Sequence, residues 1–372
     1  MSPLLIGNPS PLHNSSIHSG RSRAKLGARR IATARNFSSA VLLALLLAAL
    51  PAYSFTAIYV FGDSLSDTGR NPAPASYSNG RFSNGPLWVE YLSTNLGLPY
   101  NSTNNFAVAG SATSDLLSQV ASLPASSNLQ SALFTIESGA NDFVANTSLG
   151  SNDAAWSVMI SNTVANLTNA VGLLYANGAR EMLVGNLLNL GQTPLFNTLP
   201  ADEIVYGDSK VAEFNTELAS AMTNLMQHRT GLRIYLADLN RQLSNVVSAP
   251  AVYGFTVSTI GALQDTNLTD KSFTGPGANY IFWDPAHPTT KEHALFAALA
   301  FQLVGVQLNV ARAGTNLNLQ VSNLYPGLPY TIQSSPNLAT WTIYQTFTAT
   351  NTNAAVVLTN APGTRSFYRV EY

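Results

Sequence analysis

Five short apolar runs, each followed by a turn or a helical pattern, constrain the fold of this chain more than any other feature. The runs are rich in Val, Ile, Leu, Phe and Tyr, which is typical of buried strands. Strands that alternate with helices predict βαβ units and a mostly parallel sheet. The expected strands span residues 57–61, 105–109, 133–138, 181–185 and 232–237.

Helical patterns separate these runs. Residues 154–177 repeat apolar side chains at helical spacing and end at Asn177-Gly178, which is a helix C-terminal signal. The other expected helices span residues 86–96, 208–227 and 288–303. The sequence therefore predicts one α/β domain over residues 55–308.

The sequence pattern changes after Val310, from alternating strands and helices to short strand-like runs. Aromatic and β-branched runs at 317–321, 330–333, 341–346, 355–358 and 366–370 are separated by Pro, Gly and Asn. Short strands at this spacing predict a small all-β module over residues 309–372. Residues 333–341 and 367–370 give it a loose resemblance to the fibronectin-like modules that end some secreted bacterial proteins. A spacer, a cell-surface attachment module or a glycan-binding module would each fit.

Residues 1–54 have the pattern of a secretory signal. They contain no acidic side chain, and their basic side chains precede an apolar core at 40–50, which is followed by the small residues Ala52 and Ser54. The core is short for a membrane-spanning helix, although an uncleaved anchor is the alternative. We expect cleavage near Ala52–Ser54 and a secreted, periplasmic or cell-surface protein.

Charge and cysteine content exclude several classes of function. Six of the 18 Lys and Arg lie in the leader, so the remaining chain has 12 basic against 19 acidic residues, a net charge near −7. Such a chain has no electrostatic footprint for nucleic acid. It contains 0 cysteines, which excludes thiol nucleophiles and thiolate metal sites.

Ser64 is the first candidate for catalysis. It lies in Phe61-Gly62-Asp63-Ser64-Leu65, directly after the first expected strand. The carboxyl edge of a parallel sheet is where ligands bind in such folds, so this serine is well placed to be a nucleophile. Asp and Ser also cap helices, and this stretch alone does not separate the two interpretations.

A serine nucleophile needs a base, and three histidines lie beyond the leader. His287 follows Asp284 by three residues and is flanked by prolines, so Asp284 can turn back to orient the imidazole. A turn in which Asp284 caps the next helix is the alternative. His228 ends a helical pattern, where it caps; His293 is expected to pack against the site.

Two further turns follow expected strands. Gly110 ends the second strand, where a glycine can aim its N–H at a ligand or simply terminate the strand. Asn141 lies in Gly139-Ala140-Asn141-Asp142, after the third strand, and would suit an ordinary Asx turn.

Together these stretches resemble, in order, the four blocks of the GDSL or SGNH family of serine esterases and lipases, the last being Trp-Asp-Pro-Ala-His-Pro-Thr at 283–289. The resemblance implies a flavodoxin-like three-layer fold with a mostly parallel five-stranded sheet. It implies Ser64 as nucleophile, His287 as base and Asp284 as its orienting acid. The oxyanion hole would be the N–H groups of Ser64 and Gly110 with the Asn141 side chain.

Two other stretches, residues 77–86 and 207–209, contain motifs that could be functional. Residues 77–86 resemble a loop of the plant-type and bacterial lipase-like branch, in which Arg81 and Phe82 either contact substrate or support the fold. Gly207-Asp208-Ser209 repeats the first block's tripeptide, but an acidic segment precedes it and a helical pattern follows. We interpret Asp208 or Ser209 as a helix N-cap.

The sequence thus predicts a secreted serine esterase or lipase that needs no cofactor and no metal, acting on a lipid, a small ester or an acylated glycan. A polysaccharide O-acetyl esterase and a phospholipase are alternatives with the same site. A surface-attachment or glycan-binding protein with a vestigial hydrolase domain is the non-enzymatic alternative. Its expected partners are ester substrates and a cell surface or glycan at the C-terminal module, with no nucleic acid and no stable membrane span after the leader.

Overall fold

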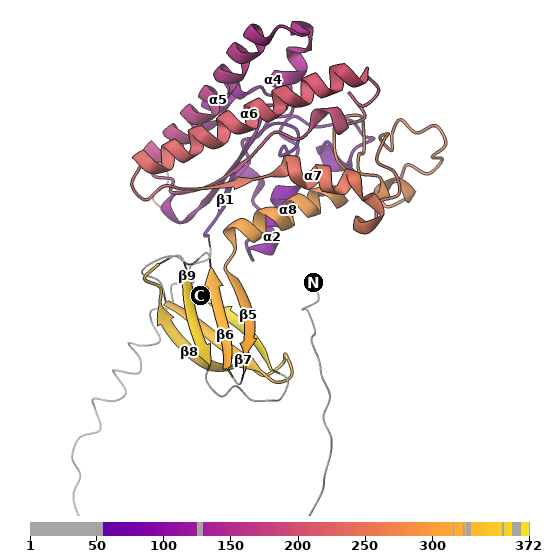
Figure 1. Cartoon of the computed structure of the whole chain (residues 1–372). Helices are drawn as coiled ribbons and strands as arrows, with labels where there is room; N and C mark the ends of the chain where they lie inside the picture. Colours follow the sequence, from indigo (N-terminus) through magenta and orange to yellow (C-terminus); the bar gives the residue numbers. More distant parts are fainter. Residues whose placement is uncertain are drawn as a thin grey trace, which may run out of the picture.

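The computed structural model describes residues 55–371 except 125–128, 315, 323, 325–328, 352 and 359–365. The expected leader lies outside the described residues. Figure 1 shows a sheet covered by helices and, after helix α8 (Thr290–Val304), a smaller body made of strands.

The central sheet is parallel. Its strands β1 (Ile58–Gly62), β2 (Leu133–Glu137), β3 (Glu181–Gly185) and β4 (Arg233–Ala237) lie in the order β1-β2-β3-β4. Every residue of β2 and β3 is buried, as expected where helices cover both faces of a sheet. The predicted α/β class is confirmed, and the strand bounds differ from those expected by one residue at most.

The remaining expected strand, residues 105–109, lies against the free edge of β1 but makes only one parallel bridge, Val60 to Asn105. Phe106 N–H donates to Val60 O at 2.7 Å and Val108 N–H to Gly62 O at 3.1 Å. The ladder is incomplete because Gly62 N–H donates instead to the Gln119 side chain at 2.9 Å.

This edge segment decides where a site can form. The chain runs from β1 to the segment on one side and then returns to β2 on the other, so the strand order reverses at β1. In doubly wound sheets of this order, ligands bind at the reversal, outside the carboxyl ends of the strands. Here that point lies beyond the ends of β1 and β2.

Two apolar layers hold the helices on the sheet. Phe61, Phe134 and Ile136 face the layer that includes α3 (Leu116–Ala121), α5 (Asp153–Ala176) and α6 (Ala201–His228). Alternate strand residues face the opposite layer, which includes α2 (Trp88–Asn95), α7 (Leu239–Ser248) and α8. Figure 1 shows α5 and α6 on one side of the sheet and α7, α8 and α2 on the other.

One helix corrects a sequence-based expectation. Helix α6 begins at Ala201, so Gly207-Asp208-Ser209 lies inside it rather than at its N-terminus. The acidic first turn fits a helix start, because carboxylates favour the positive end of the helix dipole. Asp208 does not cap α6: its Oδ1 accepts the Gly191 N–H at 3.1 Å.

The C-terminal module contains two antiparallel three-stranded sheets. One has the order β5-β6-β9 and the other β10-β7-β8. They share an apolar core that includes Leu319, Tyr330, Ile332 and Val356. The strands are β5 (Gln307–Ala313), β6 (Asn316–Ser322), β7 (Pro329–Ser335), β8 (Thr342–Thr348), β9 (Asn353–Leu358) and β10 (Phe367–Glu371). β5 was not expected, and it crosses the predicted domain boundary between 308 and 309.

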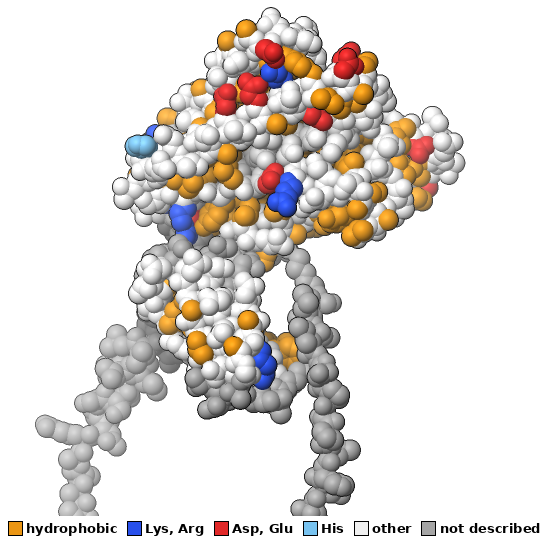
Figure 2. All heavy atoms as spheres, viewed as in Figure 1, with side chains coloured by type: hydrophobic (Ala, Val, Ile, Leu, Met, Phe, Trp, Pro, Cys, Tyr) orange, Lys and Arg blue, Asp and Glu red, His pale blue; other side chains and the backbone are white. Residues whose placement is uncertain are grey.

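The surface drawn in Figure 2 is sparsely charged, with acidic side chains gathered over the side of the large domain that carries α4 (Ala140–Ala145), α5 and α6. Charged residues make up only 10% of the chain, so polar uncharged groups cover most of this face. Among the described helices, none is both long and apolar enough to cross a membrane.

Candidate active site

Ser64 lies in the turn that follows β1. Gly62 ends the strand at φ +143°, and a β-carbon there would overlap the carbonyl oxygen of Glu137, so only glycine fits. The stretch forms a turn rather than a helix start, and in it the backbone oxygen of Asp63 accepts the N–H groups of Ser66 at 3.1 Å and Asp67 at 2.9 Å. The Ser64 hydroxyl is left to face the loop before α8.

Ser64, His287 and Asp284 form a continuous hydrogen-bonded row. His287 Nε2 lies 2.8 Å from Ser64 Oγ, and His287 Nδ1 lies 2.7 Å from Asp284 Oδ2. The other carboxylate oxygen accepts the N–H groups of Ala286 at 2.8 Å and His287 at 2.7 Å. In this geometry, the imidazole can take the hydroxyl proton while the carboxylate holds its orientation.

Asp284 is 4% exposed but is held in its ionised form. Burial acts to raise its pKa, whereas the hydrogen bond and charge of His287, with bonds from Tyr77 and the Ala286 N–H, bring the pKa below its usual value. A carboxylate that stays charged can stabilise an imidazolium on its partner.

The two predicted backbone donors are free to bind a ligand. Neither the Ser64 N–H nor the Gly110 N–H has a hydrogen-bond acceptor within the described part of the chain. Gly110 is exposed and adopts φ +86°. Asn141, in the first turn of α4 (Ala140–Ala145), donates one amide hydrogen to Ser111 O at 2.9 Å, which leaves the second unengaged.

Two aspartates that sequence reasoning did not single out hold the Gly110 segment. Asp67 Oδ2 accepts the Ala109 N–H at 2.8 Å, and Asp142 accepts both Thr113 N–H at 2.9 Å and Thr113 Oγ1–H at 2.8 Å. Asp67 also accepts three N–H groups of its own loop. Asp67 lies three residues after Ser64 and Asp142 directly follows Asn141, so these positions were the available signal.

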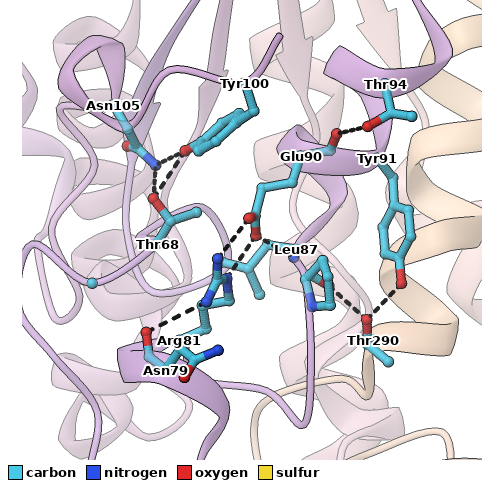
Figure 3. A network of polar contacts seen from close by, with 12 residues as sticks. Thr68, Asn79, Arg81, Leu87, Glu90, Tyr91, Thr94, Tyr100, Asn105 and Thr290 are labelled. Atoms are coloured by element: carbon cyan, nitrogen blue, oxygen red, sulfur yellow. Dashed lines mark hydrogen bonds and ion pairs between the residues drawn. The ribbon is translucent and has the colours of Figure 1, made fainter.

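Arg81 and Phe82 have different surroundings. Arg81 forms a two-point ion pair with Glu90 at 2.7 and 2.8 Å, and Glu90 also accepts the Leu87 N–H at the start of α2 (Figure 3). Of the two roles left open for Arg81, these contacts favour support of the fold over substrate contact. The Phe82 ring, by contrast, lies 5.0 Å from the His287 ring.

The other two histidines lie outside the row. His228 ends α6 and its Nδ1 lies 2.9 Å from Asn224 O, as a capping group would. His293 is fully buried beside Glu292 in α8, and neither side chain has a hydrogen-bond partner within the described residues. Burial lowers the pKa of His293 to about 3 and raises that of Glu292 to about 8.

A cavity of about 360 Å³, whose lining mixes apolar side chains with the carboxylates of Asp202, Glu203 and Asp208, lies between α4 and the start of α6. One wall comes from α4, the helix that carries Asn141. Another comes from the segment after β3, whose Leu195 N–H donates to Pro285 O at 2.8 Å. Its lining includes Phe143, Trp156, Leu190, Phe196, Leu199 and Val211. Among the described residues, no cluster of His, Cys, Asp and Glu could hold a metal ion.

Comparison with known proteins gives three findings. The GDSL-like lipase/acylhydrolase family model matches residues 58–300. The chain is 29% identical to the thermolabile hemolysin of Vibrio parahaemolyticus over 64% of this chain, but spans only 62% of that protein. It is 28% identical to a GDSL esterase/lipase of Arabidopsis thaliana, over 63% of this chain and 85% of the relative.

Among solved structures, an acetylxylan esterase from Geobacillus stearothermophilus is similar with a TM-score of 0.40 and 13% identity, over 69% of this chain and 98% of that one.

Proposed function

Because this chain belongs to the GDSL-like lipase/acylhydrolase family and is a carboxylic-ester hydrolase, we propose that Ser64 is its nucleophile, His287 its general base and Asp284 the acid that orients the base. The observation that carries this proposal is the 2.8 Å separation of Ser64 Oγ and His287 Nε2, with Asp284 at 2.7 Å behind the ring. The complete row argues against a vestigial hydrolase domain.

The proposed reaction has two halves. His287 removes the Ser64 proton as Oγ attacks the ester carbonyl, and the protonated imidazole then donates to the leaving alcohol. Water, activated by the same imidazole, hydrolyses the acyl-enzyme. In both halves the carbonyl oxygen becomes negative. The free N–H groups of Ser64 and Gly110 and the second amide hydrogen of Asn141 are the proposed donors to it.

For the substrate, we propose an ester with an acyl group longer than acetyl. The cavity beside α4 supports this choice, because its volume is within the range of small-molecule sites and aromatic and aliphatic side chains form about half of its lining. A polysaccharide O-acetyl esterase would have no use for such a cavity, whereas a phospholipase would. The predicted leader supports export, and the C-terminal module is proposed as a spacer or as a cell-surface or glycan contact.

The first experiment compares wild type with Ser64→Ala on p-nitrophenyl acetate, longer p-nitrophenyl esters, acetylxylan and phosphatidylcholine. Loss of all hydrolysis in a folded Ser64→Ala protein is expected. Full activity in that variant would exclude Ser64 as the nucleophile.

A second variant tests the cavity. Leu199→Trp places an indole at a residue that lines it, and Leu195→Trp is the control, since Leu195 is similarly exposed on the same segment but does not line the cavity. We expect Leu199→Trp to lower kcat/KM for long-chain esters about tenfold or more while leaving acetate hydrolysis unchanged. An equal effect on all chain lengths would exclude this cavity as the acyl site.

A further inference from the structure

Asp284 has a second side-chain partner that the reaction described above does not use. Tyr77 Oη–H donates to Asp284 Oδ2 at 2.7 Å, the same oxygen that lies 2.7 Å from His287 Nδ1. With two backbone N–H groups on Oδ1, the carboxylate has partners on both oxygens. Its plane is therefore fixed from outside the His287 loop, by a residue 207 positions away.

Tyr77 belongs to a strap, residues 76–86, that lies along the segment 283–290. Trp283 Nε1–H donates to Ser76 O at 3.0 Å, before the row, and Ser83 Oγ–H donates to Pro288 O at 3.0 Å, after it. Thr290 N–H then donates to Asn84 Oδ1 at 2.8 Å. The strap therefore holds the catalytic loop on both sides of Asp284 and His287.

The strap also holds the imidazole by its ring. The centroid of the Phe82 ring lies 5.0 Å from that of the His287 ring and 5.4 Å from that of the Tyr77 ring. The turn between Tyr77 and Phe82 is closed by Ser78 N–H, which donates to Ser83 O at 2.9 Å. One short turn thus brings a hydroxyl to the acid and an aromatic face to the base.

The electrostatics agree with this geometry. Burial, and then the hydrogen bond to Asp284, raise the pKa of Tyr77 well above its usual value, so the phenol remains a donor. Burial opposes ionisation of Asp284, and the bond from Tyr77 is among the contacts that overcome this. His287 and Tyr77 are the titratable side chains that act on Asp284.

We propose that Tyr77 is a positioning residue: its hydroxyl holds the Asp284 carboxylate in place against the imidazole, while Phe82 limits rotation of the His287 ring. This rests on the proposed roles of Ser64, His287 and Asp284. Residues 77–86, for which substrate contact and support of the fold were both open from the sequence, would then act on the base and its acid.

Tyr77→Phe removes the hydroxyl and keeps the ring. Tyr91→Phe is a matched control, because the Tyr91 hydroxyl lies 2.9 Å from Thr290 Oγ1 and ties α2 to the same segment without reaching the row (Figure 3). We expect Tyr77→Phe to lower kcat about ten- to hundredfold with KM within about twofold, the range for a lost hydrogen bond to a charged group. Tyr91→Phe should retain kcat within about twofold.

The pH profile separates positioning from general support of the fold. Without the Tyr77 hydroxyl, burial raises the pKa of Asp284, so activity should be lost at a higher pH on the acid side than in wild type. Thermal unfolding of both variants should change similarly. Unchanged kcat and pH profile in Tyr77→Phe, or an equal loss of kcat in Tyr91→Phe, would overturn the proposal.

The Ser64→Ala protein keeps this outcome distinct from that of the proposed function. Ester hydrolysis that depends on Ser64 but ignores Tyr77 overturns only the positioning role. Hydrolysis that does not depend on Ser64 overturns both.

Discussion

The Asp67 carboxylate accepts the Ala109 N–H at 2.8 Å, which ties the loop after β1 to the segment that ends in Gly110. These two stretches carry the proposed backbone donors of the oxyanion hole. Asp67 is 1% exposed and accepts four N–H groups, so it orders both stretches at once. The site is therefore organised by residues adjacent to the reacting groups as well as by those groups.

The Asp67 clamp predicts a catalytic cost for Asp67→Asn. Each carboxylate oxygen accepts two N–H groups, so an amide NH₂ in either orientation would face two of them, and the Gly110 segment would lose its register with Ser64. We expect kcat to fall about ten- to hundredfold, because hydrogen bonds to a charged group are the stronger class.

Asp115→Asn is the control for this variant. Asp115 accepts the Ala112 N–H at 2.9 Å on the same segment, but it is exposed. Its kcat should remain near that of wild type, as measured by steady-state kinetics beside thermal unfolding. Equal losses in the two variants would contradict the clamp.

Asn141→Ala removes the proposed side-chain donor. If its second amide hydrogen stabilises the oxyanion, kcat should fall about a hundred- to a thousandfold with little change in KM. Asn146→Ala is the control, because the Asn146 amide donates to Asp142 O at 2.8 Å at the far end of the same helix. A Asn141→Ala enzyme with a wild-type kcat would exclude this residue from the hole.

The two Gly-Asp-Ser tripeptides begin at Gly62 and Gly207, and replacing these two glycines by alanine should change the stability of the protein in opposite directions. A methyl group at Gly62 would overlap Glu137 O at an unfavourable φ, so Gly62→Ala should lower the free energy of unfolding by more than about 2 kcal/mol. Gly207 lies inside α6 with nothing within 4 Å of an added β-carbon. Gly207→Ala should therefore stabilise by about 0.5–1 kcal/mol. Urea denaturation measures both changes; destabilisation by Gly207→Ala would contradict the helix interior assignment.

Glu292 predicts a pH dependence of stability. Burial raises its pKa in the folded state from the ordinary 4.5 to about 8, so the folded protein holds this proton more tightly than the unfolded chain. The resulting stability is fully present below pH 4.5 and is lost as the pH rises through about 8. Glu292→Gln should therefore gain stability over wild type as the pH is raised.

This comparison is cleanest above pH 6.5, where His293 is neutral both folded and unfolded. The free energies of unfolding of the two proteins, measured by urea denaturation from pH 6.5 to pH 9, should diverge by an amount on the order of a few kcal/mol. Parallel curves would show that Glu292 does not titrate in this range.

Local patterns predicted much of the fold. The strands were evident because Val, Ile and Leu runs stop at turn residues, and α5 because its apolar spacing ends at Asn177-Gly178. Helix α7 was missed because Asn, Arg, Gln and Ser fill the positions between Leu239, Leu243 and Val246. Asp238 caps the start of α7, where its Oδ1 accepts the Arg241 N–H at 3.0 Å. In a short polar segment, one such aspartate does not distinguish a helix start from a turn.

For the site, the three-residue spacing of Asp284 and His287 allowed the acid to reach the ring or to cap a helix, and the resemblance of residues 283–289 to the family's last block favoured the first. The roles of Asp67 and Tyr77 were not predictable in this way. Their partners lie 42 and 207 residues along the chain, and only the packing of the sheet edge brings them together. Phe82 was flagged through its motif, but its contact with the base depends on the same packing.

The central claim is that Ser64 is the nucleophile, and covalent labelling tests it most directly. The protein is incubated with a fluorophosphonate, and the modified peptide is identified by mass spectrometry as ester hydrolysis is followed in parallel. We predict one label, on Ser64, that forms as activity is lost and is absent from Ser64→Ala. A label on another serine such as Ser209, or undiminished hydrolysis after Ser64 is modified, would contradict the account.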